Sequence, residues 1–207
     1  QAEVQFAFEA RHLLGDRAWR DRILKLAERA RREPLPPFIA TNTFWANLGG
    51  KVSAVKVREL GSGRTLEVPT AMAMTDLVVK GAVPTPRAYA IEPSAAARFI
   101  PVLKAQGLRF ETLTAPRRVK VERVKLLRLE EPYDDLYQRY KDRQIVERQA
   151  AADLDLPPGT LVVPLDQELA RRAIQVLEPC LLYGLYGYPG FRELARPGAD
   201  LPVSRLF

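Results

Sequence analysis

The stretch that decides the fold is residues 157–179, PPGTLVVPLDQELARRAIQVLEP. It opens with the turn-forming triplet Pro157-Pro158-Gly159 and continues into residues 160–165, an apolar and β-branched run that predicts a buried strand. Residues 167–177 then space their apolar side chains as a helix does, with Asp166 placed to cap it and a proline to end it. A strand followed directly by a helix indicates a domain that contains both kinds of element.

From residue 51 onward most of the other signals are those of strands. Residues 51–60 and 64–69 predict a hairpin joined by Gly61-Ser62-Gly63. Residues 119–129 predict one long strand whose alternation shifts after Val121, which indicates a β-bulge. A helix capped by Ser94 is expected to run to Gln106 with Gly107 as its stop. Short strands are expected at 89–91, 108–113 and 145–150, and a closing edge strand is expected at 203–206. These predictions describe an α+β fold with a mainly antiparallel sheet and a few helices.

The first 33 residues have a different pattern. Positions 4–9 alternate in hydrophobicity, which predicts a strand, and positions 16–30 predict a long amphipathic helix. A strand, a short loop and a long helix are a common way for an α/β domain to end. The prolines at 34, 36 and 37 are the best candidate boundary, so we expect one unit at 1–33 and a second at 34–207.

The composition excludes several classes of protein. Hydrophobic residues make up 47% of the 207 residues, which excludes wholesale disorder. No apolar run approaches the roughly 18–20 residues that cross a bilayer, so no membrane span is expected. The single cysteine excludes an intrachain disulfide framework. The N-terminal residues have neither a methionine nor a signal pattern, and we expect the chain to be part of a longer protein.

The net charge of +7 raises the question of nucleic acid. Residues 117–128 hold six basic side chains and one acidic side chain, and the charges alternate with apolar residues. This pattern favours a half-buried strand with a solvated outer face over a nucleic-acid groove. No aromatic residue lies among these charges, which argues against a stacking platform for bases. Nucleic-acid binding by this segment is the weaker alternative.

Histidine and cysteine are almost absent. The chain has only His12 and Cys180, so a zinc site with three protein ligands, at least two of them His or Cys, would need both residues and is not expected from this chain alone. We therefore expect no metal ligand here, and Cys180 is expected to pack as a small hydrophobe. Glu9 is the candidate catalytic residue, because it ends an apolar strand, where groups in α/β sheets meet the ligand crevice. The alternative for Glu9 is a surface contact with Arg11 or Arg17.

Several stretches resemble the C-terminal region of bacterial zinc carboxypeptidase-like metallopeptidases. Residues 158–167, followed by Leu177-Glu178-Pro179, resemble that family's turn, valine-rich strand, helix and Leu-Glu-Pro, and residues 201–206 resemble its last strand. Phe8-Glu9-Ala10-Arg11 resembles the family's Glu-Thr-Arg segment, with Ala10 in place of the usual threonine.

The resemblance implies the C-terminal portion of a zinc-dependent metallocarboxypeptidase. Residues 1–33 would be the last strand and helix of the carboxypeptidase-type α/β domain, and 34–207 an α+β accessory domain. Glu9 would be the general base, and zinc would be held upstream of this chain, which alone is expected to be inactive. The substrate would be a peptide or protein, and a secreted or periplasmic location is implied. The main alternative is a non-catalytic module that binds protein, peptide or glycan through Tyr183, Tyr186 and Tyr188.

Overall fold

The computed structural model describes residues 32–46, 53–70, 76–130, 143–179, 181, 184–188 and 190–207, with five helical residues before them. These five are Asp21, Leu24, Lys25, Glu28 and Arg29. Their helical state agrees with the helix predicted over 16–30. The strand predicted over 4–9 lies outside the described residues, and the boundary after residue 33 stays a prediction.

A six-stranded antiparallel sheet forms the centre of the described domain, in the order β10-β7-β12-β5-β11-β6. Its strands are β5 (Ala88–Ile91), β6 (Glu111–Thr112), β7 (Arg117–Glu122), β10 (Ala152–Leu156), β11 (Leu161–Pro164) and β12 (Val203–Leu206). Two helices with defined bounds accompany it, α3 (Pro93–Ala105) and α4 (Ala170–Leu177), and the turns 185–187 and 192–194 are 3-10 helices. The described part is therefore mostly antiparallel sheet with few helices, as expected for the coarse fold class.

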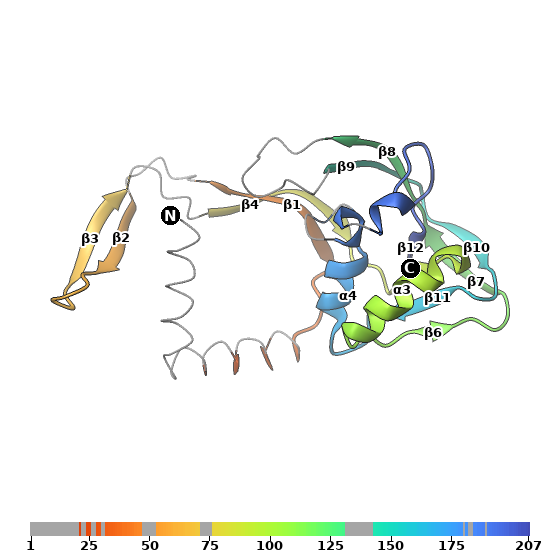
Figure 1. Ribbon diagram of the computed structural model, residues 1–207, viewed down its shortest axis with the longest axis horizontal. Coiled ribbons are helices and arrows are strands. Elements are labelled where there is room, and N and C mark those ends of the chain that lie inside the picture. Colours follow the sequence, from red (N-terminus) through yellow and green to blue (C-terminus); the bar gives the residue numbers. More distant parts are fainter. Residues whose placement is uncertain are drawn as a thin grey trace.

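Three two-stranded ribbons complete the structure. They pair β1 (Phe38–Ala46) with β4 (Asp76–Pro84), β2 (Ser53–Arg58) with β3 (Thr65–Thr70), and β8 (Val124–Glu130) with β9 (Arg143–Arg148). The β2–β3 hairpin confirms the prediction around Gly61-Ser62-Gly63, where Gly61 and Gly63 both have positive φ angles. In Figure 1 this hairpin lies apart from the six-stranded sheet, with β1 and β4 between them.

The core lies mainly on one face of the six-stranded sheet. Tyr89 and Ile91 of β5 point to that face and join a cluster with Phe99 and Leu103 of α3 and Leu177 of α4. The alternate residues of β5, two alanines, belong to a smaller cluster on the opposite face. Each fully buried large side chain stabilises the fold by about 1.5–3 kcal/mol. The helices thus pack against the sheet face that also receives Leu161 and Val163 of β11 and Val203 of β12.

The single strand predicted over residues 119–129 is wrong. The structure has two strands, β7 and β8, which belong to different sheets and are separated by Arg123. Val121 joins the smaller cluster, whereas Val124 joins the main one. The shift in alternation therefore marks a change of sheet and of buried face rather than a bulge.

Both predicted helix caps are also wrong, although the predicted stop is confirmed. Helix α3 begins at Pro93, so Ser94 lies in its first turn, where proline at the first position is already suited to a helix start. Helix α4 begins at Ala170 without a side-chain cap, and Asp166 pairs with Arg109 instead. Gly107 follows the end of α3 with φ +68°, as a helix stop does.

Candidate functional site

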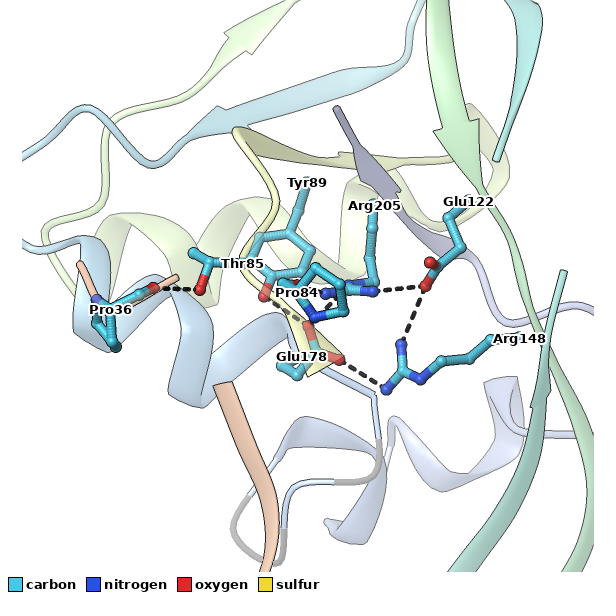
Figure 2. A network of polar contacts seen from close by, with 8 residues as sticks. All are labelled: Pro36, Pro84, Thr85, Tyr89, Glu122, Arg148, Glu178 and Arg205. Atoms are coloured by element: carbon cyan, nitrogen blue, oxygen red, sulfur yellow. Dashed lines mark hydrogen bonds and ion pairs between the residues drawn. The ribbon is translucent and has the colours of Figure 1, made fainter. Parts of the chain in front are cut away.

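Four charged side chains form a closed ring of alternating sign in the interior: Glu122, Arg148, Glu178 and Arg205, called here the ionic ring (Figure 2). They come from four separate places in the chain. Glu122 ends β7, Arg148 ends β9, Glu178 follows the last residue of α4, and Arg205 lies in β12. The ring therefore joins elements that are far apart in sequence.

Each carboxylate in the ionic ring contacts both guanidinium groups. The Oε1 atom of Glu122 lies 2.5 Å from Nη1 of Arg205 and 3.2 Å from Nη1 of Arg148. The Oε1 atom of Glu178 lies 2.9 Å from Nη2 of Arg148. The Oε2 atom of Glu178 lies 3.2 Å from Nε of Arg205, an ion pair whose geometry does not meet that of a hydrogen bond. The two positive and two negative charges balance within one cluster.

The ionic ring is removed from solvent most completely at Glu178 and Arg205, whose side chains are both 0% exposed. Glu122 is 14% exposed and Arg148 is 21% exposed, so the ring has one side nearer the surface. Burial of a charge costs several kcal/mol unless partners and hydrogen bonds compensate it. All four members are thus mutually dependent.

Further groups complete the surroundings of Arg205 and Glu178. The hydroxyl of Tyr89 donates a hydrogen bond of 2.7 Å to Oε2 of Glu178. Burial, followed by the negative charge of Glu178, raises the pKa of Tyr89 far above its ordinary value, so the hydroxyl remains a donor. Arg205 donates to the carbonyl of Pro84, and its guanidinium carbon lies 5.2 Å from the ring centre of Phe207.

The geometry of the ionic ring indicates a structural role. A general base must reach the proton of a substrate, but both carboxylates here are held by guanidinium groups. The ionic ring connects β7, β9, β12 and the end of α4, and the hydrogen bond from Tyr89 adds β5. Nearby, Thr85 Oγ1 donates to the carbonyl of Pro36 at 2.5 Å, so the start of β1 is tied to the end of β4 beside the ring (Figure 2).

A surface pocket of about 200 Å³ lies elsewhere, where residues 33–35 meet residues 165–168 and the start of α4. Its lining is largely polar and charged, and its charges have partners in the structure. Asp166 pairs with Arg109 at 2.6 Å, and Arg171 donates to the carbonyl of Pro34 at 3.3 Å. The contact between Arg171 and Pro34 connects α4 to the segment that follows the N-terminal helix.

Several residues singled out from the sequence lie outside the described residues: Glu9, His12, Cys180 and Tyr183. The catalytic role of Glu9 therefore stays a prediction. Of the other two tail tyrosines, Tyr186 is buried and Tyr188 is 44% exposed, so the described part of this tail does not form an exposed aromatic stripe. Across the described residues no group of three or more His, Cys, Asp or Glu is arranged to hold a metal. No helix in this part of the chain is long and apolar enough to cross a membrane.

The basic segment 117–128 has acidic neighbours for several of its cations. Arg117 pairs with Glu111, Arg118 pairs with Asp155 at 3.3 Å, and Arg123 pairs with Asp200 at 3.8 Å. The guanidinium of Arg117 lowers the pKa of Glu111, chiefly through their hydrogen bond. These pairs agree with the interpretation of a solvated outer strand face.

Comparison of the chain with family models, with curated proteins and with solved structures gave no match. The ionic ring was not predicted from the sequence as a site. Two signals for it are nevertheless present, namely an arginine between Ser204 and Leu206 in the terminal strand and a glutamate between Leu177 and Pro179. Neither signal identifies its partner.

Proposed function

We propose that this chain is the C-terminal portion of a zinc-dependent metallocarboxypeptidase, in which residues 34–207 act as a non-catalytic accessory domain. The observation that carries the proposal is the contact between Glu178 and Arg205. Glu178 lies in the Leu-Glu-Pro stretch and Arg205 lies in the terminal stretch, and both stretches resemble the family. One buried ion pair therefore joins the two stretches that resemble the family.

The burial of these stretches supports the same proposal. Leu161, Val162 and Val163 of β11 are buried, and so is every residue of β12. Strands β11 and β12 both pair with β5, so the stretches that carry the resemblance form one connected part of the core.

The described residues do not fit a zinc site. They contain neither of the chain's two His and Cys residues, and they hold no suitable group of carboxylates. We therefore assign no catalytic step to them. Under the proposal, the zinc ligands belong to the preceding part of the parent protein, and this chain would contribute Glu9.

The test uses the longer gene product that includes this chain. Zinc-dependent release of C-terminal residues from peptides is measured for the parent protein and for its Glu9→Gln variant. Loss of a general base should lower kcat by about 10²–10⁴-fold. Glu28→Gln, a change at an exposed helical position, is the matched control and should leave activity unchanged.

Two results would contradict the proposal at different points. Retained zinc-dependent activity in the Glu9→Gln variant would remove Glu9 from the catalytic machinery. A parent protein without any zinc-dependent peptidase activity would remove the proposed function itself.

A further inference from the structure

Strand β12 lies in the middle of the six-stranded sheet, so the prediction of an edge strand at 203–206 is wrong: the strand pairs on both sides. Strand β12 pairs with β5 over four residues and with β7 over two. Among the described strand pairings it alone joins the β10–β7 pair to the β5–β11–β6 group. The sheet therefore depends on the four residues of β12, which must enter it in one register.

Apolar burial alone does not select this register. In the structure Arg205 lies opposite Tyr89, and Ser204 lies opposite Ala90. A slip by one residue is excluded because it moves every side chain to the other face of the sheet. A slip by two residues keeps each face, and it would place Val203 or Phe207 opposite Tyr89. Both replacements are apolar and suit a buried position.

The charges distinguish these registers. A slip by two residues in one direction places Arg205 opposite Arg87, and a slip in the other direction places it opposite the fully buried Ile91. Either slip withdraws a cation from the ionic ring, so Glu122 and Glu178 would share Arg148 alone. The carbonyl of Pro84 would also lose its donor. An uncompensated buried charge is strongly unfavourable.

We propose that the ionic ring is a register-selecting device for β12: Glu122 and the fully buried Glu178 accept the terminal strand only where it presents Arg205. This role is independent of the activity proposed for the parent protein. Buried ionic groups can specify one arrangement among several that satisfy apolar burial equally well. Here the alternatives are the two-residue slips of a strand only four residues long.

Two disulfide reporters distinguish the registers in a Cys180→Ser background. The pair Ala90→Cys with Ser204→Cys reports the observed register, because these residues are opposite each other. The pair Ala88→Cys with Ser204→Cys reports a slip by two residues. All three positions are small and buried, and a disulfide needs Cα atoms within about 4.4–6.8 Å, so only an opposed pair links readily.

Two variants of the ionic ring are each combined with both reporter pairs. Arg205→Met with Glu178→Gln removes one charge of each sign. Val203→Arg with Arg205→Val keeps all the charges but moves the arginine by two positions. Arg98→Met with Glu193→Gln removes an exposed ion pair and is the control. Linked and free thiols are quantified by alkylation and mass spectrometry after refolding of the full chain.

With the ionic ring intact, and in the control, only the 90–204 pair should link. The variant without Arg205 and Glu178 should link both pairs, and the relocated arginine should make the 88–204 link the main product. If the first variant does not fold, as judged by circular dichroism, the relocated variant decides the test because its charges remain balanced. A relocated variant that links 90–204, or that fails to fold, overturns the proposal.

Discussion

Replacement of Arg205 by methionine tests how much the ionic ring contributes to the free energy of unfolding. The Arg205 side chain is fully buried and contacts both Glu122 and Glu178. Methionine fills much of the same space but removes the charge. The two carboxylates would then share Arg148 as their cation within the ring.

The expected loss of stability follows from these contacts. Removing one partner of a buried ion pair costs about 3–5 kcal/mol, because the remaining charge is uncompensated. The carbonyl of Pro84 also loses its donor, which adds about 1–3 kcal/mol if no other donor replaces it. A domain of this kind has a free energy of unfolding of about 5–15 kcal/mol, so the variant should be close to unfolding.

The assay is urea denaturation followed by circular dichroism, arranged as a double-mutant cycle with Glu178→Gln. Because the double variant restores charge balance, its loss should be smaller than the sum of the two single losses by about 0.5–3 kcal/mol. The exposed pair of Arg98 and Glu193 is the control, and its disruption should cost at most about 1 kcal/mol. A loss below about 1 kcal/mol for Arg205→Met, or strict additivity in the cycle, would refute the reasoning.

Two further predictions concern single groups near the core. Tyr89→Phe removes a donor to a buried carboxylate and should cost about 1.5–3 kcal/mol in urea denaturation at pH 7. The pKa of Tyr89 is raised in the folded state, so the stabilisation by its neutral hydroxyl is complete below the unfolded-state pKa of about 10 and is lost as the pH rises above that value. The free energy of unfolding of the wild type should therefore fall between about pH 10 and 12 relative to that of Tyr89→Phe. Parallel pH profiles for the two proteins would contradict this. Gly107→Ala places a Cβ atom at φ +68° and 3.4 Å from Cδ1 of Leu169, and it should lower stability by about 1–2 kcal/mol, whereas an unchanged urea midpoint would show that the turn is not strained.

Local features of the fold could be predicted from neighbouring residues. The β2–β3 hairpin follows from two alternating segments around Gly61-Ser62-Gly63. Strand β11 follows from its valine-rich run after a proline-glycine turn, and the end of α3 follows from Gly107. In each case the signal lies within a few residues of the structure it predicts, because backbone geometry and alternation act at short range.

Features that depend on distant partners could not be predicted in this way. The residues from Arg117 to Glu130 form two strands because β7 pairs with β10 and β12, whereas β8 pairs with β9. Asp166 is a good cap by type, yet it pairs with Arg109 from another part of the chain. The sequence alone does not identify which of several compatible partners a residue contacts in the folded protein.

The candidate sites show the same difference between features that neighbouring residues predict and features that depend on distant partners. The place of Glu9 after an apolar strand, together with a resemblance, predicts its catalytic role, which stays a prediction. The sequence does not mark Glu122, Arg148 or Arg205 as site residues, because each is an ordinary charged residue in its own segment. Their importance arises only when four segments bring them within ion-pair distance.

The sequence by itself determined the class of the described domain, the positions of its turns and the alternation that divides each strand into two faces. Only the tertiary structure decided that the last strand lies at the centre of the sheet and that Arg205 meets Glu122 and Glu178. The physical reason is that hydrophobic burial and backbone preference are properties of single segments, whereas compensation of buried charge is a property of the assembled set.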